Sequence, residues 1–181
     1  MLSQWLHGNP PSGLFASRES WPPASFAELA GALANDGIQS VMVGGRADLP
    51  VAREIEAALG VPQGGDVVLN LMGTDLPTLA GILSACRALV SNDSGAMHLA
   101  TALGVPVTAV FGATDERQTG PVQWSDSSSP RHVLTSYVWC RPCLLRECPI
   151  DHRCMTAISP AAVSGSVIAQ IERGREPRTI A

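Results

Sequence analysis

The chain has 181 residues, of which 45% are hydrophobic and 15% are charged, and its formal net charge is −4. This balance suits one globular domain with a proper core and excludes an intrinsically disordered chain. All twelve basic residues are arginines, and they form no cluster dense enough to follow a phosphate backbone, so no nucleic acid is expected as a partner.

No apolar run approaches the roughly 18–20 residues that a transmembrane helix requires. The N-terminal stretch MLSQWLHGNPPSG lacks the charged start and the long apolar run of a signal peptide. These patterns predict a cytoplasmic protein with at most peripheral membrane contact.

Residues 1–20 are rich in Pro, Gly and Ser and show no periodicity, so we expect an irregular segment there. The remainder, 21–181, is predicted to form one domain in which helices and strands alternate. A helix with Ser25 as N-cap is predicted to end at Asn35-Asp36-Gly37. Further helices are predicted over about 49–59, 77–87, 95–104 and 160–173, and strands over 40–45, 67–73, 88–93 and 105–112.

The predicted strands are apolar without alternation, and short connections join them to the helices. This is typical of a parallel sheet covered by helices on both faces. The sequence therefore predicts the α/β fold class, as a Rossmann-like doubly wound parallel sheet. After Gly112 the pattern breaks into a long polar loop over 113–130.

The stretch SNDSGAMHLATALG places polar residues between a buried strand and an apolar helix. Ligands of open α/β sheets bind at the carboxyl ends of strands, and a helix N-terminus there attracts anions. Ser94 adds a hydroxyl, Gly95 permits close approach to the backbone, and His98 follows one turn later. The alternative is that Asp93 or Ser94 only caps the helix and that His98 is an ordinary helical residue.

The segment LVSNDSGAMHLATALGVPVTAVFGATD resembles the donor-binding motif of glycosyltransferase family 9, the ADP-heptose:lipopolysaccharide heptosyltransferases. LNLMGTDLPTLAGILSAC and WPPASFAELAGALANDGIQSVMVGG resemble the family's elements before this motif. WCRPCLLRECPIDHRCM resembles the tail of the heptosyltransferase II branch. The similarity covers approximately residues 15–170.

The resemblance implies the C-terminal half of a GT-B glycosyltransferase, which has two Rossmann-like domains with the active site between them. It implies inverting transfer of heptose from ADP-heptose to a lipopolysaccharide core acceptor, with no required cofactor. An aspartate of the other domain is the general base in this family, so no catalytic residue is assigned here. The acceptor would be bound by a missing N-terminal domain or a partner chain.

The resemblance also implies a set of donor-binding residues. The diphosphate would be held by the turn before the helix and by the histidine, the adenine would lie beside two backbone positions, and an aspartate would bind the ribose. Two further residues would line the same side of the cleft. The diphosphate residues are Asn92, Asp93, Ser94, Gly95 and His98, and the adenine positions are Thr74 and Leu76. Asp48 is the ribose aspartate, and Thr114 and Asp115 line the cleft.

Two features depart from the family pattern. The family usually carries a lysine two residues before the Trp-Pro of its opening helix, and this chain has Glu19 there, with Arg18 as a possible substitute. The domain's usual first strand has no good counterpart in residues 1–13, so the sheet is expected to lack a strand.

Four cysteines fall within a Cys-rich segment, 140–154, as C-x2-C-x4-C-x5-C: Cys140, Cys143, Cys148 and Cys154. The pattern suits a structural Zn²⁺ or Fe site, with His152 as a spare nitrogen ligand. Four reduced thiols packed around a loop, or two disulfides, remain alternatives. Cys86 is predicted to be a core residue.

Other functions stay open at this point. A non-catalytic nucleotide-binding module, or a truncated remnant, is the main alternative to half of a transferase. A nicotinamide-dependent oxidoreductase is disfavoured because no G-x-G-x-x-G follows the first strand, and without lysine there is no P-loop.

Overall fold

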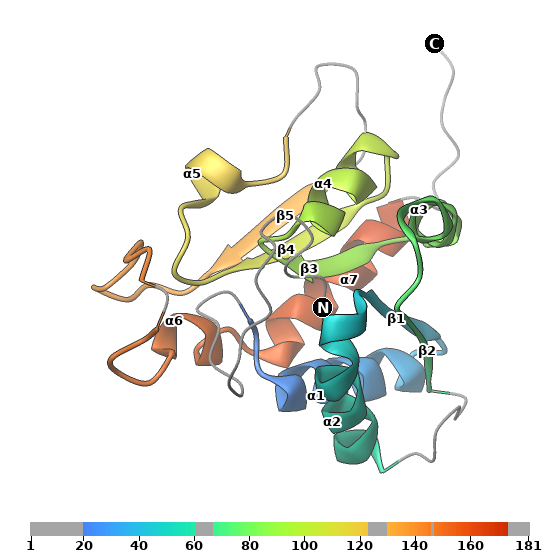
Figure 1. Cartoon of the computed structure of the whole chain (residues 1–181), viewed down its shortest axis with the longest axis horizontal. Helices are drawn as coiled ribbons and strands as arrows, with labels where there is room; N and C mark the ends of the chain where they lie inside the picture. The colour runs from blue at the N-terminus through green and yellow to red at the C-terminus, as the bar shows by residue number, and fades with distance from the viewer. Residues whose placement is uncertain (1–19, 61–66, 123–129, 146, 174–181) are drawn as a thin grey trace.

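Helices and strands alternate along the chain in the order that the apolar pattern predicts (Figure 1). The computed structural model describes residues 20–60, 67–122, 130–145 and 147–173. The helices are α1 (Pro23–Asn35), η1 (Arg46–Asp48, a 3₁₀ turn), α2 (Leu49–Leu59), α3 (Leu76–Ala85), α4 (Gly95–Ala102), α5 (Glu116–Thr119), α6 (Arg153–Thr156) and α7 (Pro160–Arg173). The segment predicted to be irregular, 1–20, lies outside the described residues except for Ser20.

All strand pairings in the described residues are parallel, as predicted, but they form two sheets instead of one. The strands are β1 (Ser40–Gly44) and β2 (Val68–Met72) in one sheet, and β3 (Leu89–Asn92), β4 (Val107–Phe111) and β5 (Arg131–Thr135) in the other. Within the described residues no strand pairs with the second edge of β1 or of β3. The prediction that the domain lacks its usual first strand concerns residues 1–13, which lie outside the described residues.

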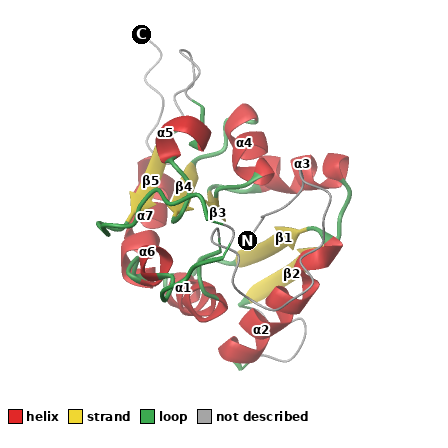
Figure 2. Ribbon diagram, turned by 60° about the vertical axis from the view of Figure 1, so that its left-hand side comes forward, coloured by secondary structure: helices red, strands yellow, loops and turns green. Residues whose placement is uncertain are grey.

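Helices cover both faces of the strands, because successive strand residues point to opposite sides. On β1, Met42 packs into the core beneath α1, α2 and α7, and its neighbour Val43 packs into the core beneath α3 and α4. On β4, Val110 faces the first core, and Phe111 faces the second. Figure 2 shows α1 and α2 lying apart from α3 and α4. The doubly wound arrangement is therefore confirmed.

Three sequence predictions need correction. Helix α1 begins at Pro23 with Pro22 as its N-cap, and not with Ser25 as the cap, because a proline at the first helical turn has a suitable φ and needs no N–H partner. Strand β5 was not predicted, since its RHVLT sequence is polar and the strand is only half-buried at a sheet edge. The loop predicted over 113–130 contains the single turn α5.

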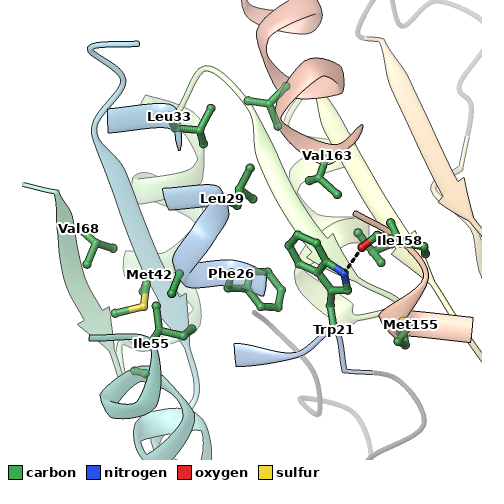
Figure 3. Packing of buried hydrophobic residues seen from close by; sticks show 14 of the residues in the cluster. Trp21, Phe26, Leu29, Leu33, Met42, Ile55, Val68, Met155, Ile158 and Val163 are labelled. Carbon is green, nitrogen blue, oxygen red and sulfur yellow. Dashed lines mark hydrogen bonds between the residues drawn. The ribbon is translucent and has the colours of Figure 1, made fainter. Parts of the chain in front are cut away.

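Trp21 is the largest fully buried side chain, and it lies just before α1 (Figure 3). Its ring packs edge-on against Phe26 at a centroid distance of 4.9 Å. Its indole N–H donates to the carbonyl oxygen of Ile158 over 2.9 Å, between α6 and α7. This residue therefore attaches the start of α1 to the C-terminal elements, and its contacts reach the functional edge described next.

Candidate functional site

The carboxyl ends of parallel strands meet at one edge of a sheet, which is where α/β proteins bind ligands. At the end of the smaller sheet, the Gly73 N–H donates to the Gly44 oxygen over 2.8 Å and joins the turns that follow β1 and β2. Gly73 has φ +84°, which favours glycine there. In the larger sheet, β3 leads directly into the N-terminus of α4.

The turn between β3 and α4 carries the centre of the predicted donor motif. Asn92 ends β3, is fully buried, and accepts the Trp21 backbone N–H at Oδ1 over 3.1 Å. Among the described residues, its Nδ2 has no hydrogen-bond partner. A buried amide donor without a partner costs about 1–3 kcal/mol, so an acceptor oxygen from a ligand would be favoured here.

Ser94 is the N-cap of α4, as one alternative predicts, and its Oγ accepts the Met97 N–H over 3.4 Å. The same Oγ lies 2.7 Å from the hydroxyl of Ser91. Gly95 opens the helix, and His98 follows one turn later with a half-buried side chain. Capping and anion binding are compatible, because the helix dipole still places partial positive charge at this end.

Asp93 and Asp115 belong to two neighbouring turns that one hydrogen bond connects. The Thr119 hydroxyl of α5 donates to Asp93 Oδ2 over 2.6 Å. Asp115 caps α5 and accepts the N–H of Arg117 over 3.0 Å. This backbone hydrogen bond, followed by one from the Gln118 side chain, lowers the pKa of Asp115, so its carboxylate stays charged.

The turns after β1 and β2 offer a carboxylate, a hydroxyl and an apolar surface. Asp48 Oδ2 accepts the Gly45 N–H over 3.0 Å, while burial raises the pKa of Asp48 above its ordinary value. Thr74 Oγ1 is buried without a partner, and Leu76 is 52% exposed at the start of α3. Hydroxyl groups and a flat apolar ring are chemically matched to these three side chains.

Arg141 is a further functional residue, which the sequence reasoning missed. Its Nε donates to the Gly112 oxygen over 2.6 Å, and one terminal nitrogen donates to the Thr114 oxygen over 3.4 Å. The same nitrogen lies 2.8 Å from a carboxylate oxygen of Glu116, and the Arg141 side chain is only 11% exposed. Arg141 therefore holds the turn between β4 and α5, which contains the predicted Thr114 and Asp115.

The four cysteines of the 140–154 segment line one small cavity, together with His152. All five cysteines are free thiols. Cys86 is half-buried at the end of α3 and belongs to neither buried cluster, so the prediction of a core residue is wrong. Backbone N–H groups of Ile150, His152 and Asp151 lower the pKa of Cys148, whereas burial, followed by the other three thiols, raises the pKa of Cys154. As they stand, no His, Cys, Asp or Glu side chains in the described residues form a ready set of three metal ligands.

The structure thus places most predicted site residues on turns at strand carboxyl ends, and it links the Asp93 turn to the Asp115 turn. Arg18 and Glu19 lie outside the described residues. Sequence reasoning missed Trp21, Thr119 and Arg141 as parts of this edge. The only available signal was that Trp21 and Arg141 lie within the segments that resemble the family.

Among the described residues, no helix has the length and apolar character to cross a membrane.

Comparison with known proteins extends these observations. The model of glycosyltransferase family 9 (heptosyltransferase) matches residues 11–153. Lipopolysaccharide heptosyltransferase 2 of Salmonella typhimurium is 39% identical over 133 residues, which cover 73% of this chain and 37% of that protein. Lipopolysaccharide heptosyltransferase 2 of Escherichia coli is 38% identical over 128 residues, covering 70% of this chain and 36% of that protein.

A solved structure of E. coli ADP-heptose LPS heptosyltransferase II matches with a TM-score of 0.68 and 26% identity, over 91% of this chain and 45% of that one. This agreement confirms the predicted α/β fold, which resembles one half of a GT-B enzyme. The chain spans little more than a third of the length of the two curated relatives described above. By the family match and by its identity to these relatives, the chain belongs to glycosyltransferase family 9.

Proposed function

We propose that this chain is the donor-binding half of a heptosyltransferase and that it binds ADP-heptose at the carboxyl edge of its strands. The observation that carries the proposal is the turn between β3 and α4, where the unpartnered Nδ2 of buried Asn92 lies beside a helix N-terminus. Both groups favour a bound anion, and a diphosphate is the charged part of the donor.

The remaining predicted residues receive roles that fit their surroundings. The diphosphate is bound by Asn92, the N-terminal N–H groups of α4 and the His98 side chain. Thr74 and Leu76 border the adenine, and the second carboxylate oxygen of Asp48 accepts from the ribose hydroxyls. The turn that Arg141 holds closes the site on the β4 side.

These groups stabilise the charge that develops on the departing diphosphate. In the proposed reaction the acceptor hydroxyl attacks the anomeric carbon, the bond from that carbon to the diphosphate oxygen breaks, and ADP leaves. The proton of the acceptor hydroxyl goes to a general base outside this chain. The lipopolysaccharide core acceptor is bound by a further domain or a partner chain, and the reaction takes place on the cytoplasmic side.

Calorimetric titration of the chain with ADP tests the proposal, with UDP and NAD as controls. We expect a dissociation constant between about 1 μM and 1 mM for ADP, equivalent to about 4–8 kcal/mol of binding free energy. UDP and NAD should bind clearly more weakly. A folded sample that binds none of the three, or all of them equally, contradicts the proposal.

A non-catalytic nucleotide-binding module is the second candidate, because Glu19 stands where the family usually carries a lysine that pairs with phosphate. The two candidates differ in turnover. ADP release from ADP-heptose, measured with an acceptor and with the separately expressed N-terminal half of a relative, should occur only with both halves if the first proposal holds. Tight ADP binding without turnover in that mixture favours the module.

A further inference from the structure

We propose that the segment 140–154 binds one thiophilic divalent metal ion, Zn²⁺ or Fe²⁺, through the thiolates of four cysteines. The ligands are Cys140, Cys143, Cys148 and Cys154. This site lies outside the donor-binding turns, and its existence does not depend on the proposed function.

The first argument is the convergence of the four side chains on one cavity. The cavity has a volume of about 20 Å³. On the same measure about 10–15 Å³ is enough to hold one water molecule. A single metal ion is therefore of suitable size. Four sulfur ligands around one ion are the usual set of tetrahedral structural zinc and iron sites.

The second argument is a repeated turn. Four residues after Cys140, Leu144 has φ +54°, and four residues after Cys148, His152 has φ +55°. In the described part of the chain these are the only residues other than glycine with positive φ. Such strained positions persist where the surrounding structure requires them, and they cluster at functional sites.

The turn at His152 also places a hydrogen-bond donor beside a cysteine sulfur. The His152 backbone N–H donates to Cys148 Sγ over 3.4 Å. A donor at this position stabilises the negative charge of a thiolate, which is the form that binds metal. The His152 ring adds a further sign of an occupant, because its side chain lines the same cavity and its buried Nε2 has no partner in the part of the chain that the structure describes.

Charge neutralisation supports the same assignment. Four thiols that bind one divalent ion release four protons to solvent and form a complex with a net charge of −2. Arg141 and Arg153 both line the cavity. They pair with Glu116 and Asp151, and their guanidinium groups still place positive charge beside the thiolates.

The thiols are not yet at bonding positions, since no ready set of three ligands exists in the described residues. The four side chains line one cavity, but neutral thiols lack the attraction to a cation that draws sulfur atoms to bonding distance. When the ion replaces the protons, side-chain rotation brings each sulfur to about 2.3 Å from it.

The alternative of simple packing explains less. Cys154 is buried, but Cys140, Cys143 and Cys148 are only half-buried, so they contribute little as apolar groups. Residues 136–145 and 147–152 form neither helix nor strand, and a stretch of this length without regular structure normally needs another means of ordering. A bound ion supplies it. The same ion would also hold Arg141, which lines the cavity, in place. An effect of the ion on the donor-binding turns, through Arg141, rests on the proposed function.

Metal analysis of the full chain tests the site. The protein is purified under reducing conditions, loaded in parallel with Zn²⁺ and with Fe²⁺, freed of excess metal by gel filtration, and measured by mass spectrometry of the elements. We expect about one ion per chain in at least one arm, and the arm that retains it identifies the metal. Cys143→Ser and Cys148→Ser should each lower the content about tenfold.

Cys86→Ser is the matched control, because Cys86 lies outside the cluster, and it should keep the full metal content. If the serine variants do not fold, Co²⁺ titration of the unaltered chain replaces them, with visible absorption of a tetrahedral thiolate complex and release of about four protons expected. A folded chain that retains less than about a tenth of an ion in both arms and gives no such absorption overturns the proposal. Equal metal loss in Cys86→Ser also overturns it.

Discussion

The turn between β3 and α4 and the cysteine segment 140–154 are held in place in different ways. The turn lies between a fully buried strand end and a helix start, which fix its backbone, and Ser94 makes local contacts with Met97 and Ser91. Two hydrogen bonds from distant parts of the chain add to this, from the Trp21 N–H to Asn92 and from the Thr119 hydroxyl to Asp93. The cysteine segment forms no regular structure before α6. Single hydrogen bonds connect it to the rest of the chain, among them that from Arg141 to Gly112, that from the Leu144 N–H to the Ala113 oxygen over 3.1 Å, and that from the Ser136 hydroxyl to the Cys154 oxygen over 2.8 Å.

The difference indicates how each region responds to change. A turn fixed by secondary structure keeps its shape when one side chain is lost, because the strand and the helix still define it. A segment fixed by single long-range contacts loses its position when one of them is removed. Trp21 contacts both parts of the molecule, through Asn92 on one side and Ile158 on the other.

Trp21→Ala is expected to have the largest effect on stability, since it removes the buried indole ring that packs between the two parts of the molecule. Replacement of a fully buried tryptophan by alanine costs about 3–5 kcal/mol of unfolding free energy. Trp21→Phe keeps most of the apolar contact but leaves the Ile158 oxygen without its donor, at a cost of about 1–3 kcal/mol. Urea unfolding followed by circular dichroism measures both.

Trp139→Ala is the control, because Trp139 is 80% exposed and its loss should change stability by about 0.5 kcal/mol or less. Equal losses at the two tryptophans would contradict the central position given to Trp21.

Arg141→Ala is expected to have the next largest effect. It removes the donors to Gly112 and Thr114 and leaves Glu116 without its partner. Loss of these part-buried hydrogen bonds should lower the unfolding free energy by about 1–3 kcal/mol. Arg141→Lys should recover little, because an ammonium group lacks the planar fork that reaches several acceptors.

The comparison variant for Arg141 is Arg117→Ala, whose side chain is 85% exposed and pairs with Asp115 at 3.8 Å. An exposed ion pair contributes about 0–1 kcal/mol. If Arg117→Ala destabilises the chain as much as Arg141→Ala, the part-buried contacts of Arg141 do not have the stabilising role given to them. Urea unfolding at one salt concentration compares them directly.

The two regions also differ in how well the sequence predicts them. The β3–α4 turn follows from local signals, namely an apolar strand, a capping serine and an apolar helix, so its elements are predicted within two residues. Strand β5 has no such signal, because an edge strand needs no continuous apolar run. The contact of Arg141 with Gly112 spans 29 residues of chain, and no local pattern encodes it.

The division into two sheets has a related cause. The apolar pattern of each strand reports that the strand is buried, but it does not report which neighbour it pairs with. In the described residues β1 and β3 each have one edge without a pairing strand, and no local pattern in the sequence reports this. Likewise, Thr119 was missed because its role depends on the turn of α5 that brings it to Asp93.

His98→Ala tests the turn as a binding site and not as a structural element. Loss of a hydrogen bond to a charged phosphate should weaken ADP binding about tenfold, with little change in unfolding free energy. Leu103→Ala, at the opposite end of α4, is the control and should leave the ADP affinity unchanged. Calorimetry of both variants decides. Unchanged affinity in His98→Ala removes this residue from the site.

Asp48→Asn is expected to have the smallest effect on stability, and its sign depends on pH. Burial raises the pKa of Asp48 above its ordinary value of 3.8, so between the two values the folded chain holds more protons than the unfolded chain. Stability therefore falls as pH rises through this window, and at neutral pH the folded state bears the burial of the charge. Asparagine carries no charge and can still accept the Gly45 N–H. Asp48→Asn should thus be slightly more stable than the unaltered chain near pH 7, and this gain should vanish at about pH 3.5, below the ordinary aspartate pKa.

The same substitution should weaken ADP binding, because the second carboxylate oxygen, an acceptor for ribose hydroxyls, becomes an NH₂ donor. Asp48→Ala separates the two effects, since it also removes the acceptor for Gly45 and should lower stability at both pH values. Urea unfolding at the two pH values and calorimetry with ADP provide the measurements. A gain in stability with unchanged ADP affinity would mean that the burial of Asp48 serves the turn alone. A gain in stability with weaker ADP binding would mean that the charged Asp48 lowers the stability of the fold and contributes to nucleotide binding, a trade-off that is common at functional sites.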